Sequence, residues 1–219
     1  MYVPAVFAES DPVAIGQFID AHPLATLVLM ADGRPHLDHV PFLRSAAAPR
    51  GGLERGSVLI AHVSKSNPTW RLAEGGVEAV LAFTGASAYV SPSLYPSKPV
   101  THEVVPTWNY VAVHLRGRLG CSHDRDEKHR VVEALTRAME APRPQPWAVS
   151  DAPALYIERM LAGIVALRFE LESVEAKRKA SQNRTPADRE GVIAGLGGDP
   201  ATAEAAAYAA RSAGEAIQR

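Results

Sequence analysis

The segment AHVSKSNP combines residue types that suit a phosphate group. His62 lies at the end of a β-rich run, and a capping residue followed by Pro68 predicts the start of a short helix. A helix start offers free N–H groups and positive potential, and Lys65 adds a full charge. The alternative is a capped turn with a solvated lysine. The residues of this predicted phosphate site are His62, Lys65, Ser66 and Asn67.

A second segment, from Phe83 to Tyr110, is rich in aromatic, hydroxyl and proline residues, although aromatics make up only 6% of the chain. Prolines fix φ and remove donors, so we expect a stiff loop rather than a strand or helix. Aromatic rings beside hydroxyl and amide groups fit a planar heterocycle with polar edges. The alternative is that Trp108 and Tyr110 fill the end of a barrel. The candidate contacts are Tyr89, Ser91, Tyr95, Thr107, Trp108 and Asn109.

The third segment is KRKASQNR, residues 177–184. A solvated charge run is the usual explanation of such basic residues. The Ser-Gln-Asn group in its middle has another use, because side-chain amides can read the edge of a ring system. The candidates here are Lys179, Ser181, Gln182, Asn183 and Arg184.

Composition excludes several classes of protein. The 219 residues are 47% hydrophobic and 21% charged, with a formal net charge of −1, which disfavours a dedicated nucleic-acid binder. The single Cys121 excludes an internal disulfide and a cysteine-rich metal site, and the histidines show no close metal spacing, so no metal is expected. We find no signal peptide and no apolar run of the roughly 20 residues that a membrane helix needs. We therefore expect a soluble, cytoplasmic protein without membrane contact.

Hydrophobic patterning predicts about seven strands with few helices between them. Strands are expected at 24–30, 35–43, 57–63, 77–83, 87–90, 108–119 and 163–177. Helices are expected after Asp11-Pro12, over 125–140 behind a capping box of Asp124 and Glu127, and over 154–161. The Asp32-Gly33 pair predicts a hairpin turn, whereas 84–85 is expected to separate two strands.

Strands joined mainly by hairpins favour a closed or nearly closed antiparallel barrel over a doubly wound sheet. The expected fold class is mainly β with peripheral helices. The barrel domain is expected at 1–176, and a basic segment with a helical C-terminal tail that packs on the barrel is expected at 177–219.

Five fragments in order resemble the PaiB-like family, the FMN-binding negative transcriptional regulators. They are MYVPAVF, HVSKSNP, the F-x-G…YVSPS…Y run, VPTWNY and K-x-SQNR. The resemblance implies an FMN-binding split β-barrel, a homodimer with flavin near the subunit interface, and a regulatory role in some relatives. It places the phosphate at His62–Asn67, the ring against VPTWNY, and residues 181–183 over the ring. Leu94, where an aromatic is expected, and Ala180, where leucine is common, depart from the family pattern.

Three alternatives stay open beside an FMN-binding regulator. A flavin-dependent oxidoreductase would leave His62 and Tyr95 as the side chains to test for acid–base roles, since flavin carries the redox chemistry. A haem-binding split barrel would need an axial histidine. Direct DNA binding is the weakest alternative, because the net charge is near zero and no helix–turn–helix pattern is evident. Whether the protein is an enzyme is left open.

Overall fold

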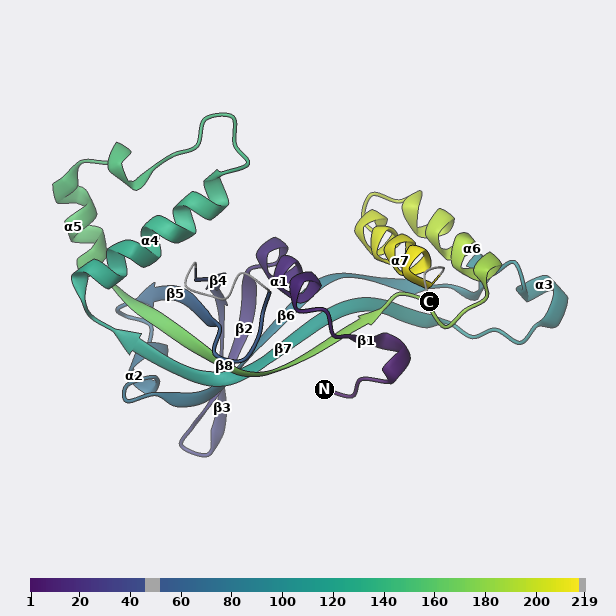
Figure 1. Cartoon of the computed structure of the whole chain (residues 1–219), viewed down its shortest axis with the longest axis horizontal. Coiled ribbons are helices and arrows are strands. Elements are labelled where there is room, and N and C mark those ends of the chain that lie inside the picture. The colour runs from purple at the N-terminus through teal and green to yellow at the C-terminus, as the bar shows by residue number, and fades with distance from the viewer. Residues whose placement is uncertain (46–51, 217–219) are drawn as a thin grey trace. The chain divides into compact units, whose positions relative to one another are not determined.

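The computed structural model describes residues 1–45 and 52–216 (Figure 1). The chain divides into two compact units, each described by itself. Unit 1 comprises Met1–Ser10, Thr84–Val113 and the chain from Glu175 onward, and unit 2 comprises Asp11–Phe83 and His114–Val174. The expected division between residues 176 and 177 stays a prediction.

The strands form one mainly antiparallel sheet, as predicted, in the order β3-β2-β6-β7-β8-β5-β4, with β1 paired to β8. Within unit 2, β3 lies against β5, but no backbone ladder joins them among the described residues. One residue after β3 the chain enters β4, which pairs with β5 at Leu43 and Arg44, so the missing ladder is confined to β3 itself. We call this unpaired stretch between β3 and β5 the seam. The strands are β1 (Ala8–Glu9), β2 (Leu24–Ala31), β3 (Arg34–Pro41), β4 (Leu43–Arg44), β5 (Val58–Ser64), β6 (Val77–Val90), β7 (Thr107–Ser122) and β8 (Ile164–Lys179).

Unit 2 holds the barrel core. Alternate residues of its strands point inward, and Leu27, Leu81 and Phe169 are fully buried. Asp32 and Gly33 both have positive φ, 52° and 72°, which confirms the predicted hairpin turn. The helical elements of this unit are α1 (Pro12–Ala21), α2 (Thr69–Leu72), α4 (Arg125–Glu140), η3 (Val149–Asp151) and α5 (Ala154–Ala162).

Two of the three helix starts predicted in unit 2 from a capping residue are confirmed at the expected residues. The Asp11 side chain accepts a hydrogen bond from the backbone N–H of Val13 at 2.9 Å, and Pro12 opens α1. The Asp124 side chain accepts one from the N–H of Glu127 at 2.7 Å at the start of α4. Each bond satisfies a donor that the first helical turn leaves free.

Unit 1 is built on the end of β6, the start of β7 and the end of β8. Its helices α6 and α7 cover one face of these strands, where Ala88 and Val90 are buried against Val192, Leu196 and Ala205 (Figure 1). The predicted helical C-terminal tail is thus confirmed. The helical elements of this unit are η1 (Ala5–Phe7), η2 (Pro92–Leu94), α3 (Lys98–Thr101), α6 (Pro186–Gly197) and α7 (Ala203–Ala216).

Two expectations for the Phe83–Tyr110 segment are wrong. Residues 84–85 do not separate two strands, since β6 runs unbroken from Val77 to Val90. The connection is confined to 91–106, because 84–90 belong to β6 and β7 begins at Thr107, and it contains the short helical elements η2 and α3 where only loop was expected. The ladder between β6 and β7 satisfies the backbone on both sides of Gly85, so one glycine does not end the strand. The four prolines of the segment all lie in this connection, where no ladder needs their N–H.

No helix among the residues that the structure describes is both long enough and apolar enough to cross a membrane.

Candidate functional site

Unit 1 presents an exposed aromatic and basic surface opposite its helices. Ala88 and Val90 face α6 and α7, so the residue between them, Tyr89, points to the other side of the sheet. We call this surface the aromatic–basic face. Its residues are Tyr89, Trp108, Tyr110, Lys177 and Lys179, of which Tyr89 and Trp108 are exposed, Tyr110 and Lys179 are partly exposed and Lys177 is buried.

Two neighbouring rings are the largest apolar groups of this face. The ring centroids of Tyr89 and Trp108 are 6.1 Å apart at an angle of 56°. Each residue is 52% exposed, although aromatic side chains usually bury most of their area. An exposed pair of rings on adjacent strands offers flat apolar contact to a planar molecule.

Two lysines lie beside these rings. Lys179 donates to the carbonyl oxygen of Trp108 at 2.9 Å and to the Thr107 hydroxyl. Lys177 donates to the carbonyl oxygen of Tyr2 at 3.2 Å and lies 5.2 Å from the centre of the Tyr110 ring. Burial, together with the charge of Lys177, lowers the pKa of Lys179 although Tyr110 opposes the change. An anionic ligand would stabilise both ammonium groups.

Asn109 and Ser181 lie on the covered side. Both are almost fully buried, and the Asn109 amide donates to the Ser181 hydroxyl at 2.9 Å. Ser181 has φ 62°, a left-handed conformation that turns the chain after β8. The pair ties the start of β7 to this turn, so both side chains are used within unit 1.

The rest of the KRKASQNR turn is also engaged with the chain itself. The Gln182 amide oxygen accepts from the N–H of Ala180 at 2.7 Å, and its nitrogen donates to the carbonyl of Arg178. The guanidinium of Arg184 lies 4.9 Å from the centre of the Tyr95 ring. Asn183 is exposed at the tip of the turn. Of the predicted amide contacts, Asn183 is the one that presents its side chain to solvent.

Tyr95 belongs to the core of unit 1 rather than to its surface. It is 2% exposed, and its hydroxyl has no hydrogen-bond partner among the described residues. The preceding Leu94 packs against α6, where Gly191 and Gly195 have no side chain to obstruct it. Ser91 caps η2 by accepting from the backbone N–H of a following serine. Leu94, which departs from the family pattern, is therefore used to pack against α6.

The predicted phosphate segment lies in unit 2, at the seam of the barrel. Asn67 accepts from the N–H of Thr69 at 2.9 Å and donates to the Asp38 carboxylate of β3 at 2.5 Å. Asn67 therefore caps the turn as predicted, although α2 begins at Thr69 with Pro68 as its N-cap. Of the four predicted phosphate contacts, Lys65 and Ser66 are exposed.

Asp38 is the centre of this seam. Its carboxylate accepts hydrogen bonds from Asn67, from the Thr69 hydroxyl at 3.0 Å and from the N–H of His39 at 2.8 Å. Burial alone would raise the pKa of Asp38, but these bonds and the nearby His36 together hold it below its ordinary value. Because Thr69 donates to Asp38, His36 Nε2 at 2.9 Å must donate to Thr69. Side chains thus close the seam where the backbone ladder is missing.

His62 faces α4 rather than solvent. It shares a face of β5 with Ile60, which packs with Val131 and Leu135 of α4. Its Nδ1 atom is buried without a partner in the described structure, and burial lowers the pKa of the ring. Because burial disfavours the charged form of the ring, His62 is a poor source of positive charge for a phosphate.

The structure thus brings together four of the predicted contacts in unit 1, which are Tyr89, Thr107, Trp108 and Lys179. His62–Asn67 belong to unit 2. Sequence reasoning grouped Lys177 with Lys179 in the basic segment but left it out of the predicted contacts, although their i, i+2 spacing on a strand placed both on one face. It also left Tyr110 as barrel filling. In the described part of the chain no group of His, Cys, Asp and Glu is arranged to hold a metal ion.

Comparison with known proteins gives one matching family, described as "Putative FMN-binding domain", over residues 1–173. An uncharacterized protein of Emericella nidulans is 31% identical over 226 residues, which covers 90% of both chains. The protease synthase and sporulation protein PAI 2 of Bacillus subtilis is 29% identical and covers 88% of this chain and 87% of its own.

Two solved structures share the fold. The FAD and heme binding protein from Mycobacterium smegmatis has a TM-score of 0.52 at 20% identity, and covers 76% of this chain and 70% of its own. The flavocytochrome Anf3 from Azotobacter vinelandii has a TM-score of 0.53 at 17% identity, and covers 82% and 70%. At these identities the comparison shows the split-barrel fold alone.

Proposed function

Because the chain belongs to the family of putative FMN-binding domains, we propose that it binds FMN and that the aromatic–basic face contacts the cofactor. The observation that carries this assignment is the exposed pair of Tyr89 and Trp108 with Lys179 beside it. FMN, when bound, supplies one- and two-electron redox chemistry, and the protein supplies binding and orientation.

The chemistry of the face suits the two parts of FMN. The isoalloxazine ring is planar and apolar with polar edges, which matches the Tyr89 and Trp108 rings. The phosphate is anionic, which matches the ammonium group of Lys179, whereas the neighbouring Lys177 is buried. None of the five residues of the face is a histidine, whereas the haem alternative needs an axial one. The face therefore favours flavin over haem.

A titration with FMN, followed by quenching of flavin fluorescence, tests the assignment. Trp108→Leu removes a stacking surface worth about 1–2 kcal/mol, so we expect roughly a five- to thirtyfold weaker Kd. Lys179→Met removes a charge-assisted contact worth about 1.5–3 kcal/mol, so we expect a loss of about tenfold or more. The exposed Tyr156→Leu and Lys98→Met serve as matched controls and are expected to bind like the wild type.

The same titration separates two positions for the phosphate. Lys65→Met tests the predicted phosphate segment, and Lys179→Met tests the aromatic–basic face. A loss of FMN affinity with Lys65→Met alone would return the phosphate to residues 62–67. Failure of the wild type to bind FMN, or equal Kd values for Trp108→Leu and Tyr156→Leu, would refute the proposal for the face.

We further propose a cytoplasmic homodimer, which rests on the resemblance to flavin-binding split barrels. Light scattering at two concentrations is expected to give twice the chain mass of 23.4 kDa, and a monomer at both would overturn it. A regulatory role is supported by the name of the Bacillus subtilis relative. Arg178 pairs with Glu9 at 3.0 Å, which reduces the free positive charge of the basic segment and favours regulation without direct DNA contact.

A further inference from the structure

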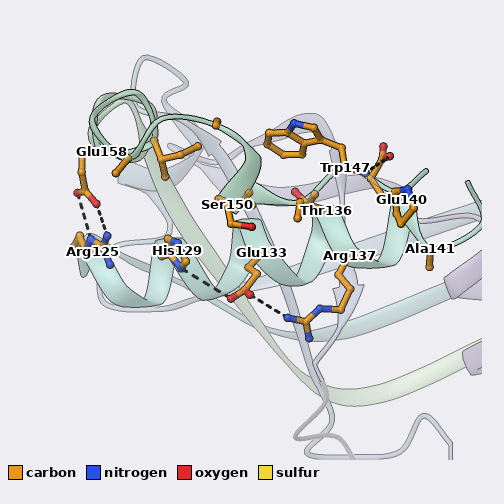
Figure 2. Close-up of a pocket in the computed structure, with 16 residues that line it drawn as sticks. Arg125, His129, Glu133, Thr136, Arg137, Glu140, Ala141, Trp147, Ser150 and Glu158 are labelled. Atoms are coloured by element: carbon orange, nitrogen blue, oxygen red, sulfur yellow. Dashed lines mark hydrogen bonds and ion pairs between the residues drawn. The ribbon is translucent and has the colours of Figure 1, made fainter. Parts of the chain in front are cut away.

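Unit 2 contains a pocket of about 700 Å³ that shares no residue with the aromatic–basic face (Figure 2). One wall is α4, and the other is the chain that returns from Ala141 through η3 into α5. Its volume lies in the range of small-molecule sites, which is about 300–1,000 Å³. Its lining includes His129, Glu133, Thr136, Glu140, Trp147 and Ala148.

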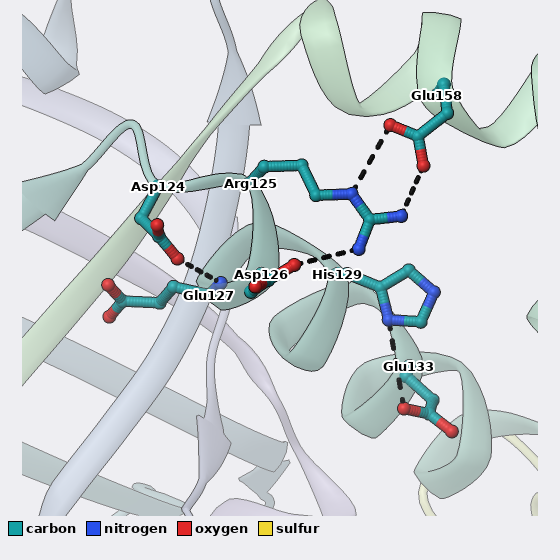
Figure 3. A network of polar contacts seen from close by, with 7 residues as sticks. All are labelled: Asp124, Arg125, Asp126, Glu127, His129, Glu133 and Glu158. Carbon is teal, nitrogen blue, oxygen red and sulfur yellow. Dashed lines mark hydrogen bonds and ion pairs between the residues drawn. The ribbon is translucent and has the colours of Figure 1, made fainter.

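The returning chain is held in place at both of its ends. The Glu140 carboxylate accepts from the N–H of Trp147 at 3.1 Å, and the Asp151 carboxylate accepts from the N–H of Ala148 at 2.9 Å. At the other end the Arg125 guanidinium of α4 is bound to the Glu158 carboxylate of α5 (Figure 3). Three prolines in 142–146 stiffen the span between α4 and Trp147. The pocket is therefore preformed rather than a slack space between mobile parts.

The wall opposite α4 carries an aromatic ring. Trp147 is 45% exposed and lines the pocket together with Pro146 and Ile157 (Figure 2). The hydroxyl-bearing Thr136 and Ser150 line it as well. A preformed site with an aromatic wall and a few polar groups is the usual form of a site for a small ring-containing molecule.

The charges of the lining residues determine whether a cationic or an anionic ligand is preferred. Two arginines and three glutamates line the pocket. Arg125 is already bound to Glu158 and to Asp126 at 2.9 Å (Figure 3). Arg137 donates to Glu133 at 3.1 Å, and Arg143, which lies outside the lining, pairs with Glu140 at 3.0 Å. Each lining glutamate is therefore paired with an arginine, but with Asp126 these groups number four carboxylates against three arginines, which leaves an excess of one negative charge. A cation would be attracted, and an anion would be repelled.

We propose that this pocket binds a small molecule that carries one aromatic ring and a single cationic nitrogen. The ring stacks on Trp147, and the cationic group lies on the side of α4 near Glu133 and Thr136. An indole face also attracts a neighbouring cation, which adds to the preference for a positively charged ligand. This proposal does not depend on FMN binding, because it uses a different set of residues.

Isothermal titration with 2-phenylethylamine, and with 3-phenylpropionate as an anion of similar size, tests the proposal. The wild type is expected to bind the amine at least tenfold more tightly than the acid. Ala148→Phe is expected to fill the pocket and abolish binding. Trp147→Leu and Glu133→Gln are each expected to weaken binding about tenfold. Met139→Leu, an exposed change on α4 outside the lining, is the matched control and is expected to bind like the wild type.

Thermal unfolding of each variant shows whether it is folded, and Glu133→Gln and Met139→Leu keep the test informative if Ala148→Phe is not. Three results would overturn the proposal. These are no heat of binding with the wild type at 10 mM probe, tighter binding of 3-phenylpropionate, or unchanged binding by a folded Ala148→Phe variant. A change of oligomeric state in Ala148→Phe would assign the pocket to a second copy of the chain, and would also overturn it.

Discussion

Asp38 provides the sharpest test of how the split barrel is closed. The change Asp38→Asn keeps the shape of the side chain but removes its charge, and it places an NH₂ group against donors from β3 or from Asn67 and Thr69. The three hydrogen bonds that Asp38 accepts would each be worth about 1.5–3 kcal/mol if they were fully buried. Asp38 is only partly buried, so solvent screening reduces the net loss to about 1–2 kcal/mol in total. For a chain of this size we expect the midpoint of thermal unfolding to fall by about 3–6 °C.

The dependence on pH makes this prediction specific. Because the folded state holds the pKa of Asp38 below its unfolded value, the stabilisation is complete above the unfolded pKa, which is about 3.9. It is lost as the pH falls through the lower folded pKa. The difference between wild type and Asp38→Asn should therefore be full at pH 6–7 and should shrink as the pH falls below about 4.

Urea denaturation at a series of pH values measures this difference directly. Asp32→Asn is the matched control, because Asp32 is exposed in a hairpin turn with positive φ, which asparagine also tolerates. We expect this control to unfold like the wild type. The seam argument is refuted if Asp38→Asn is as stable as Asp32→Asn at neutral pH, or if its deficit is unchanged at pH 3.

Three further predictions follow from the packing. Because burial lowers the pKa of His62, the unfolded state takes up the proton first as the pH drops below about 6.5, so stability should fall toward pH 5.5. The change His62→Leu should therefore reduce the difference between the urea midpoints at pH 7.5 and pH 5.5. The change His102→Leu, at an exposed histidine, should leave that difference as it is in the wild type. Gly191→Ala should destabilise the protein by about 1–3 kcal/mol, since the added Cβ would lie 2.2 Å from the Leu94 carbonyl oxygen of η2. Gly197→Ala, whose added Cβ would lie 3.8 Å from its nearest neighbour, should leave the stability measured by urea denaturation unchanged or raise it. Tyr95→Phe removes a buried hydroxyl without a partner, so it should leave the thermal midpoint unchanged or raise it, and a clear drop would reveal a partner that the described residues do not supply.

Local signals in the sequence predicted most of the elements. The capping aspartates Asp11 and Asp124 fix helix starts through bonds to residues two or three positions away, so they could be read directly. The turn at Asp32-Gly33 likewise depends on which residues tolerate positive φ. The strand break expected at 84–85 failed because a ladder with β7, a distant segment, overrides the local signal of one glycine.

The candidate site divides along the same line. Residue types indicated Tyr89, Trp108 and Lys179 as predicted ligand contacts, because aromatic rings stack on planar groups and ammonium groups pair with anions. Residue types could not show which of the candidate side chains are buried or bonded within the protein itself. Tyr95 is in the core, and Asn109 is bonded to Ser181 in the covered layer of unit 1. These assignments depend on which face of a strand a helix covers.

By itself the sequence determined a mainly antiparallel β fold and a helical C-terminal tail, and it predicted contacts for a planar heterocycle with polar edges. These follow from periodicity, capping and residue type, which act over a few positions along the chain. The tertiary structure decided that side chains after β5 bond to Asp38 of β3, that His62 faces α4, and that the chain after α4 encloses a pocket. Such features depend on contacts between residues far apart in sequence, and no local pattern records them.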